Sequence, residues 1–363
     1  MQFTTARETL LNAILIAERV VGKKESLPVL SCVVLEIGKE CVIRATNLEA
    51  AVDVRVPGEI SDPGTLAVPV AIFSQTLRSL SGDKVTLKEE SGNMLVEARG
   101  SKTLIKTISH DEFPRVSGKE GAGVSISREK LVVALQSVAY AASPSMIRPE
   151  LGSVYLRLDQ GALVSVATDS FRLAEKTTPQ AAEGECDILI PLKHVQELSH
   201  ILDRMKDDEV VLVLDDAQLT VRGDGIEYVS RLVDATFPNY REIIPKKFTT
   251  EATLLKGDLV ETLRKARIFA GAEQRVGLHV YPKKRVFDVT AQSAAIGEMS
   301  DSVEAGLVGD DIDINFHVGY LSDALPTIQS DSVILGFSGA GRPLVIRGSS
   351  DTTFTYLVMP LNR

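Results

Sequence analysis

The stretch LTVRG at 219–223 recurs as LVEARG at 95–100 and as LVIRG at 344–348. The arginines of these three Arg-Gly pairs stand 123 and 125 positions apart. A proline lies downstream of each copy, and the three are Pro114, Pro238 and Pro360. Self-similarity at a fixed period is the signature of a repeated structural unit. The chain of 363 residues is therefore expected to hold three copies of one unit of roughly 120 residues.

Two more series of segments keep the same register, and each shows apolar residues near the 3.6-residue period of a helix. The opening helices are predicted over 7–21, 128–142 and 257–271, and the second helices over 68–80, 190–202 and 316–328. Thr5 and Glu8 predict a capping box before the first helix, and Ser127 is a candidate N-cap of the next opening helix. Apolar runs such as VVLVL at 210–214 and FTYLVM at 354–359 predict buried strands.

Linkers at 115–124, which is rich in glycine, and at 246–252 separate the copies. The expected domains span 1–118, 125–246 and 250–363. Each reads as helix, strands, helix, strands, which predicts an α+β fold with mostly antiparallel sheets.

Composition places the chain among soluble globular proteins, because 44% of residues are hydrophobic and 25% are charged. The longest apolar run near the start is too short to cross a bilayer, and the opening residues lack the pattern of a signal peptide. Three cysteines, Cys32, Cys41 and Cys186, form no CxxC pair and are expected to be reduced and buried. We expect a cytoplasmic protein with no membrane partner.

Charge is unevenly distributed along the chain. The net charge is −9, yet the six helix windows with their immediate flanks carry +7, which leaves −16 for the remainder. A solvated helix face of mixed charge is the plainer interpretation. Basic helices on one side of an acidic protein would instead form a surface that can face DNA without gripping it. Enclosure of DNA requires few phosphate contacts, so an acidic net charge does not exclude it.

An enzyme is disfavoured by the motifs the sequence lacks. No GxxxxGK[ST], HExxH or GxSxG occurs, and the Gly-rich stretch 118–123 matches no phosphate loop. The five histidines are scattered, and His194 and His200 stand six apart on one predicted helix, which suits surface positions better than metal ligation. We expect no catalytic residues, no metal and no cofactor.

Four segments resemble a known family: LPVL at 27–30, ATDSFRLAEKTTP at 167–179, FPNYREIIP at 237–245 and TYLVMPLNR at 355–363. They resemble the bacterial DNA polymerase III sliding clamp, the β subunit of the replicative polymerase, and the resemblance covers the whole chain. It implies a non-catalytic subunit of a DNA-directed DNA polymerase complex. It also implies a head-to-tail homodimer, closed as a ring of six domains with helices lining the hole, that encircles duplex DNA without reading its sequence. An ATP-driven clamp loader places such a ring on DNA. The alternative weighed is a ring scaffold that does not bind DNA.

The resemblance also implies a hydrophobic pocket between the second and third domains. This pocket would capture short linear peptides of the polymerase catalytic subunit, the clamp loader and repair polymerases. Its residues here would be Arg148, Leu151, Thr168, Ser170, Phe171, Arg172, Leu173, Pro238, Ile243, Pro343, Val345, Leu357, Met359, Pro360 and Leu361. Many family members have Gly-His where Ser170-Phe171 stand, and the tail ends in Leu-Asn-Arg here. Ser170-Phe171 predicts a more hydrophobic pocket rim with altered polar contacts. The Leu-Asn-Arg tail stands in place of a more usual Met-Arg-Leu, which leaves the roles of Asn362 and Arg363 open.

Two further sets of residues follow from the resemblance. The residues expected to face DNA, as phosphate contacts without base readout, are Lys23, Lys24, Arg148 and Lys193. The residues expected at a dimer seam between domain one of one copy and domain three of the other are Leu104, Ile105, Ile268 and Phe269. An apolar contact of this head-to-tail kind would close after two copies.

Overall fold

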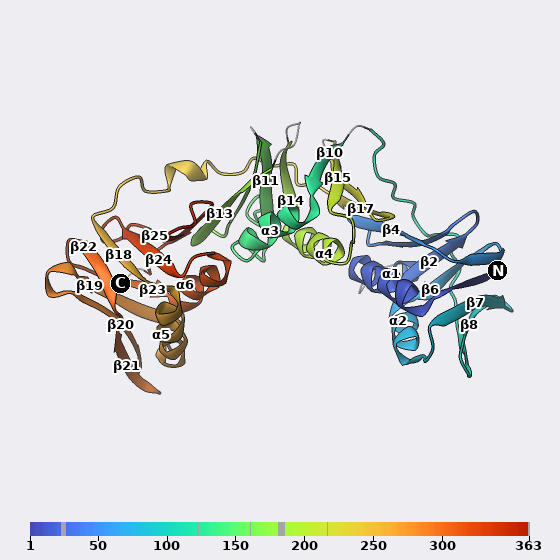
Figure 1. Ribbon diagram of the computed structural model, residues 1–363, viewed down its shortest axis with the longest axis horizontal. Coiled ribbons are helices and arrows are strands. Elements are labelled where there is room, and N and C mark those ends of the chain that lie inside the picture. Colours follow the sequence, from blue (N-terminus) through green and yellow to red (C-terminus); the bar gives the residue numbers. More distant parts are fainter. Residues whose placement is uncertain (23–26, 122, 160, 181–185, 216, 362–363) are drawn as a thin grey trace. The chain divides into compact units, whose positions relative to one another are not determined.

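The computed structural model describes residues 1–22, 27–121, 123–159, 161–180, 186–215 and 217–361. By its internal contacts the chain divides into two compact units. Unit 1 comprises Met1–Val132, Gln180–Cys186 and Lys193–Asp234, and unit 2 comprises Val133–Pro179, Asp187–Leu192 and Ala235–Arg363. Figure 1 shows the elements of both units. Among the described residues, no helix is long and apolar enough to span a membrane.

The first third of the chain begins with a strand that leads directly into a helix. Its elements are β1 Gln2–Ala6, α1 Arg7–Val20, the 3-10 turn η1 Pro28–Ser31, β2 Cys32–Ile37, β3 Cys41–Thr46, β4 Ala50–Val56, β5 Glu59–Asp62, β6 Gly64–Pro69, α2 Val70–Ser79, β7 Lys84–Glu90, β8 Asn93–Ala98 and β9 Ser101–Ile105. Helix α1 packs on β2, β3 and β4 and lies alongside α2. The apolar face of α1 is buried because Leu10, Ile14 and Ala17 follow the helical period.

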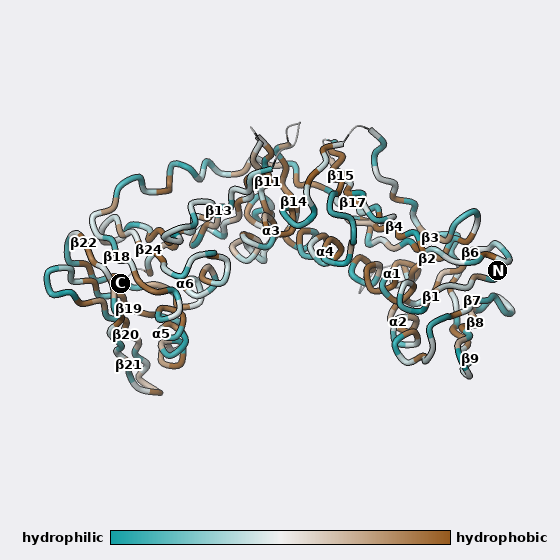
Figure 2. Tube along the Cα trace, in the orientation of Figure 1, coloured by the Kyte–Doolittle hydropathy of each residue, from teal (hydrophilic) through white to brown (hydrophobic). Residues whose placement is uncertain are grey.

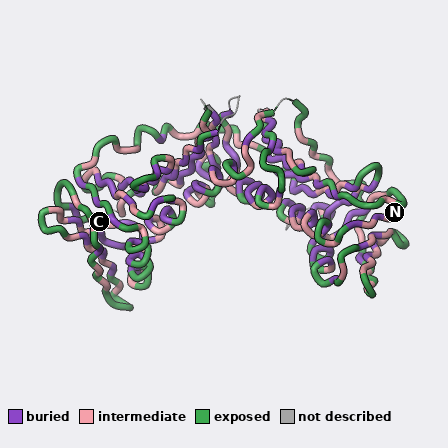
Figure 3. The backbone as a smooth tube through the Cα atoms, in the orientation of Figure 1, coloured by how far each residue is buried: buried purple, intermediate pink, exposed green. Residues whose placement is uncertain are grey.

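The middle third repeats this order without the short strand β5. Its elements are β10 Val124–Ser127, α3 Arg128–Ala139, β11 Ser153–Asp159, β12 Ala162–Thr168, β13 Arg172–Pro179, β14 Cys186–Pro191, α4 Leu192–Leu202, β15 Glu209–Leu214, β16 Gln218–Gly223 and β17 Ile226–Arg231. A long segment then leads to the last third and contains η2 Tyr240–Glu242. In Figure 3 this segment, between β17 and β18, is mostly exposed or intermediate, and Tyr240 is its buried residue.

The last third follows the same plan with a shorter second helix. Its elements are β18 Thr250–Leu255, α5 Lys256–Phe269, β19 Arg275–Tyr281, η3 Pro282–Lys284, β20 Val286–Ser293, β21 Gly297–Ser302, β22 Ala305–Gly309, β23 Ile312–His317, α6 Val318–Ala324, η4 Leu325–Thr327, β24 Ser332–Phe337, β25 Leu344–Gly348 and β26 Phe354–Val358. The three stretches that first indicated the repeat, at 95–100, 219–223 and 344–348, overlap the equivalent strands β8, β16 and β25.

The sheets run across the repeats, and all pairings given for their strands are antiparallel. Unit 1 holds sheets ordered β5-β1-β7-β8-β9 and β10-β15-β16-β17-β4-β3-β2-β6. Unit 2 holds sheets ordered β14-β11-β12-β13-β26-β25-β24-β18-β22 and β21-β20-β19-β23. Two joins make the long sheets continuous, because β17 pairs with β4 and β13 pairs with β26. Each join links the last strand of one repeat to the third strand after the opening helix of the repeat before it.

Most buried side chains of the core are aliphatic, and the largest fully buried ones are aromatic, among them Tyr228, Tyr356 and Phe3. Hydrophobic and polar residues alternate along many strands in Figure 2, as expected where one face is buried. Cys32, Cys41 and Cys186 form no disulfide and are buried, as predicted.

The capping prediction for the start of the first helix was wrong. The Thr5 capping box is wrong, because Thr5 belongs to β1 and its hydroxyl donates to the Pro57 carbonyl oxygen over 2.6 Å. Helix α1 begins at Arg7 without a side-chain cap. Ser127 fits its predicted role better, since the Lys130 N–H points to its Oγ at 3.5 Å. A strand before the opening helix was missed in all three repeats, because each is only four to six residues long.

Candidate functional site

The turn between β12 and β13 carries the first group of predicted pocket residues. The Thr168 hydroxyl donates to the Arg172 carbonyl oxygen over 2.7 Å, and Asp169 Oδ1 accepts the N–H groups of Phe171 and Arg172 at 2.9 and 3.0 Å. Ser170 has a φ of +77°, where a Cβ crowds the backbone and glycine is preferred. This tight turn leaves Phe171 outside the sheet, with 60% of the residue exposed.

Arg172 ties this turn to the third repeat. Its Nε donates to Asp169 Oδ2 over 3.0 Å, and its guanidinium also pairs with Asp323 of α6. The guanidinium lies 4.5 Å from the centre of the Tyr320 ring, and only 12% of the Arg172 side chain is exposed. Arg172 therefore positions the turn and has little freedom to bind a peptide directly, whereas the sequence suggested a polar contact.

The C-terminal tail runs beside the same turn. The Met359 N–H donates to the Phe171 carbonyl oxygen over 2.8 Å, and the Leu361 N–H donates to the Asn315 carbonyl oxygen over 2.8 Å. Strand β26 ends at Val358, before Pro360, which has no N–H to continue a ladder. Met359 is 37% exposed, so Met359 and Phe171 present two flexible, apolar surfaces next to each other.

Beneath these residues lies a buried cluster on one face of the long sheet of unit 2. Leu173, Val345 and Leu357 are buried there together with Val166 and Tyr240. They come from adjacent strands, because Leu173 pairs with Leu357 and Leu357 with Val345. These three predicted pocket residues therefore form the floor of the site and belong to the core.

The long segment after β17 covers this floor. The Phe237 ring stacks on Tyr155 with a centroid separation of 5.0 Å, and the Tyr240 hydroxyl donates to Glu175. Of the predicted pocket residues on this segment, Pro238 is half-buried and Ile243 is exposed. Tyr240, Asp169 and Asp323 were missed by the sequence analysis. An aspartate at the start of a turn often accepts hydrogen bonds from backbone N–H groups two or three residues later. The sequence Asp169-Ser170-Phe171 could therefore have indicated the role of Asp169.

The remaining predicted pocket residues lie around this site in unit 2. Pro343, Pro360 and Leu361 are half-buried. Leu151 is buried in the turn that leads to β11, where its N–H donates to the Arg148 carbonyl oxygen over 3.0 Å. Arg148 is exposed and pairs with Glu150 at 3.0 Å.

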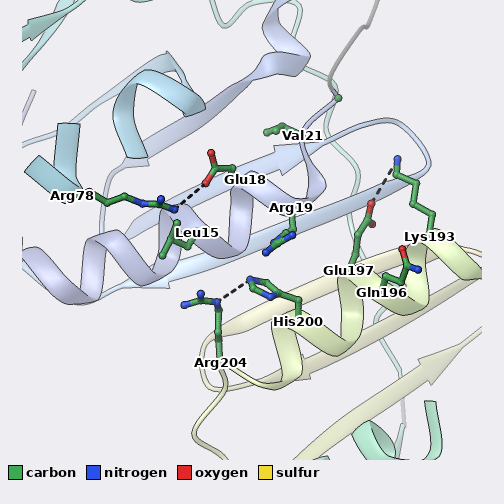
Figure 4. Close-up of a pocket in the computed structure, with 11 residues that line it drawn as sticks. Leu15, Glu18, Arg19, Val21, Arg78, Lys193, Gln196, Glu197, His200 and Arg204 are labelled. Carbon is green, nitrogen blue, oxygen red and sulfur yellow. Dashed lines mark hydrogen bonds and ion pairs between the residues drawn. The ribbon is translucent and has the colours of Figure 1, made fainter. Parts of the chain in front are cut away.

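A second group of interest lies in unit 1, where α1 and α4 border a cleft of about 630 Å³. Figure 4 shows its side chains converging from the two helices. The cationic groups are Arg19, Arg78, Lys193 and Arg204, and the carboxylates are Glu18 and Glu197. Among the described residues that line the cleft, Lys193 was expected to face DNA. Arg19 and Arg204 escaped notice because single arginines on a helix of mixed charge carry no distinct signal.

Hydrogen bonds fix several of these groups. Arg204 donates from Nε to His200 Nε2 over 3.0 Å and from Nη1 to Asn12 Oδ1 over 2.8 Å. Partial burial, with Arg19 and Arg204 nearby, lowers the pKa of His200, which suits a ring that accepts a hydrogen bond from arginine. Two neutral side chains thus hold Arg204 in place, whereas Arg78 pairs with Glu18 at 3.9 Å.

Lys193 stands above a buried carboxylate. Its Nζ lies 3.6 Å from Glu197 Oε1, and the Tyr228 hydroxyl donates to Glu197 Oε2 over 3.1 Å. Burial raises the pKa of Glu197, although Lys193 and Tyr228 oppose that shift. His194 is buried and lies 2.9 Å from the Ser230 hydroxyl, so the predicted surface position is wrong for His194. Lys23 and Lys24 lie outside the described residues.

The predicted seam residues lie at sheet and helix ends. Leu104 on the edge strand β9 is 49% exposed, but Ile105 is 3% exposed and packs inside its own unit. Alternation along a strand sends neighbouring side chains to opposite faces, so only one of the two can face a partner. Ile268 at the end of α5 is 61% exposed, and Phe269 is half-buried beside Gly297 of the edge strand β21.

Comparison with protein families assigns this chain to a known family. Three models of the DNA polymerase III beta subunit match nearly the whole chain: the N-terminal domain over 1–117, the central domain over 125–239 and the C-terminal domain over 241–362. The chain belongs to the family of bacterial beta sliding clamps. Its function is that of a DNA sliding clamp, and nothing supports the alternative of a scaffold without DNA.

Individual relatives agree with this assignment. The chain is 27% identical to the Beta sliding clamp of Pseudomonas aeruginosa over 99% of this chain and 100% of that one, and 24% identical to that of Bacillus subtilis over 99% of both. The crystal structure of the Thermotoga maritima DNA polymerase III beta subunit superposes with a TM-score of 0.95 at 26% identity, covering 100% of this chain and 99% of that one. The Pseudomonas aeruginosa sliding clamp bound to griselimycin superposes with a TM-score of 0.93 at 26% identity, covering 100% of both.

Proposed function

We propose that two copies of this chain close head to tail into a ring around duplex DNA and tether the replicative polymerase, without catalysis of their own. Family membership supports the clamp function. The observation that carries the DNA contact is the cationic cleft between α1 and α4. Its four cations exceed its two carboxylates. A DNA phosphate passing over these helices would therefore meet a positive surface.

The DNA contact is a phosphate contact and carries no sequence information. Lys193, Arg19 and Arg204 present charge from two helices, and Arg148 adds an exposed guanidinium in unit 2. Lys23 and Lys24 belong to the same proposal on the basis of the family resemblance. Few such contacts give weak affinity, which suits a ring that must slide.

The two sheet joins support ring closure. The last strands of the second and third repeats, β17 and β26, pair with the third strands β4 and β13. The equivalent strands left at sheet edges are β9 of the first repeat and β21 of the third. A second copy can supply the missing partner for each, which gives a head-to-tail interface that closes after two copies. Leu104, Ile268 and Phe269 lie next to these edges.

The proposed tether is the Phe171 and Met359 surface above the Leu173 floor. It offers apolar contact area with a rigid turn beneath it, which favours capture of a short linear peptide. Deletion of residues 359–363 is expected to abolish binding of a peptide from the replicative polymerase. The same deletion should leave the dimer intact, because the seam lies at other strands.

The DNA proposal is tested with topology. After loading by a clamp loader and ATP, the protein should remain on nicked circular DNA and be lost when that circle is cut. Lys193→Glu combined with Arg204→Glu should shorten retention on the circle, whereas Lys206→Glu, a neighbouring charge change outside the cleft, serves as the control. Equal retention on cut and circular DNA would contradict enclosure. If the double variant and Lys206→Glu shorten retention equally, the cleft does not contact DNA.

A further inference from the structure

A second cleft lies in unit 2, on the same face of the long sheet as the proposed peptide site. Its volume is about 460 Å³, and its walls come from β12, β13, β25 and the segment before β18. Val164 on β12 alternates with Ser165, whose hydroxyl donates to the Ala134 carbonyl oxygen of α3. Because neighbouring residues of a strand face opposite sides, the cleft opens on the side of the sheet away from α3.

The cleft holds an excess of positive charge. Arg241, Lys246 and Arg347 line it, and within the described chain none of the three forms an ion pair with a carboxylate. The carboxylate in the cleft, Glu175, accepts the hydroxyl of Tyr240. Arg241 hydrogen-bonds to the Tyr240 side chain and is attracted by Glu175, so the excess charge of the cleft comes from Lys246 and Arg347. Outside its helix windows the chain is strongly acidic, so this excess is unusual for its surface.

Arg347 shows that the charge is poorly satisfied. Its guanidinium lies 5.9 Å from the centre of the Phe248 ring, and its Nε is buried without a hydrogen-bond partner. A buried donor left unpaired costs free energy that an incoming acceptor can recover. A solvated lysine or arginine on an open surface would not have this property.

The cleft continues the proposed peptide site along the strands. Strand pairing places Leu173 beside Leu357 and Val345 in one row across the sheet, and Glu175 lies one row further along β13. Arg347 stands two residues beyond Val345 on β25, in that second row. Since a strand rises about 3.3 Å per residue, Thr177 at the far wall is roughly 13 Å from Leu173. That span equals about four residues of an extended peptide.

We infer that this cleft binds the acidic flank of the linear peptide whose apolar part occupies the Phe171 and Met359 surface. The occupant is a pair of aspartate or glutamate side chains about four residues from the apolar part. The half-buried walls formed by Ile244, Pro245 and Phe248 suit the aliphatic stems of such side chains, while the cations meet their carboxylates. This inference rests on the proposed peptide site.

The test uses the full-length protein and synthetic peptides. A display-selected decapeptide whose binding is lost on deletion of 359–363 is extended, at either end, with Gly-Gly-Asp-Glu-Asp or with the amide version Gly-Gly-Asn-Gln-Asn. At one end, the acidic extension should tighten Kd by about five-fold over the amide version at low salt, and the gain should shrink as salt rises. Lys246→Gln and Arg347→Gln should each reduce this gain, whereas Lys247→Gln, an exposed neighbour that does not line the cleft, should keep it.

Three results would overturn the inference. The peptides with acidic and amide extensions could bind with equal Kd. The tighter binding of the acidic peptide could also persist in both cleft variants, which would attribute it to nonspecific electrostatic attraction. The same variants could instead weaken linear duplex binding as much as peptide binding, which would assign the cations to phosphate. Lys246 is exposed, so Lys246→Gln tests the cleft even if Arg347→Gln does not fold, and thermal melts of both variants detect such a defect. If no decapeptide depends on 359–363, the peptide site itself fails, and the flank with it.

Discussion

At the scale of single residues, Ser170 holds the turn of the peptide site in a conformation that suits glycine, with φ at +77°. A non-glycine residue is destabilised there by about 1 kcal/mol of backbone strain. Replacement by glycine removes this strain, but the greater conformational entropy of glycine in the unfolded chain offsets part of the stabilisation. We expect Ser170→Gly to raise the free energy of unfolding by about 0.5 kcal/mol, measured by urea denaturation. Ser109→Gly, at a serine without positive φ, should lower it. A loss of stability in Ser170→Gly would show that the turn is not strained.

Phe171 is expected at the rim of the proposed peptide site. Its 60% exposure predicts a rim position, so Phe171→Ala should change the free energy of unfolding by less than about 0.5 kcal/mol. The same change should weaken a bound polymerase peptide by roughly 1–2 kcal/mol in calorimetric titration. Phe354→Ala, which removes a fully buried ring from β26, should instead cost about 3–5 kcal/mol of stability. Unchanged peptide affinity in Phe171→Ala would exclude it from the site.

At the scale of the elements, the join between β4 and β17 contains a titrating carboxylate. Burial raises the pKa of Asp53 to about 6; Arg44 opposes this shift, and Glu227, its direct partner across the join, adds to it. A raised pKa means that the folded state binds the proton more tightly, so this contribution to stability is present at low pH. It is lost as pH rises from about 4 to about 6.

Asp53→Asn should therefore gain stability relative to the natural chain as pH rises through that window. We expect a relative gain of about 1–2 kcal/mol between pH 4 and pH 7, discounted for the partial exposure of the side chain. Urea denaturation at several pH values measures it, and Asp234→Asn, at an exposed position, is the control. A pH-independent difference between Asp53→Asn and the natural chain would refute the role of Asp53.

At the scale of the whole molecule, the edge strands β9 and β21 predict the oligomer. Ile268 is exposed beside the proposed seam, and Ile268→Lys would bury a charge in an apolar contact, at a cost of a few kcal/mol. Sedimentation should show a dimer for the natural chain and monomers at micromolar concentration for the variant. Val260→Lys, also at an exposed position on α5, should remain dimeric. A dimeric Ile268→Lys would place the seam elsewhere.

The sequence by itself predicted the repeat, the two helices of each copy and their alternation with groups of strands. These features were readable because the three stretches that end in Arg-Gly and the apolar periods are local patterns that recur in register. The buried cysteines were readable for a related reason, since three thiols without pairing motifs suit an apolar interior. The family resemblance then supplied the pocket residues, most of which the structure places around one turn, one tail and one floor.

Tertiary structure alone decided how the repeats are connected and which residues remain free to bind. The joins of β17 to β4 and β13 to β26 pair strands far apart in the chain, and no local period encodes such pairing. Burial separated Phe171 from Leu173, and Leu104 from Ile105, although each pair lies close in sequence. The three cations Arg241, Lys246 and Arg347 line one cleft although they lie apart in the sequence. A charge is paired or free only with respect to its neighbours in space, and the sequence does not contain those neighbours.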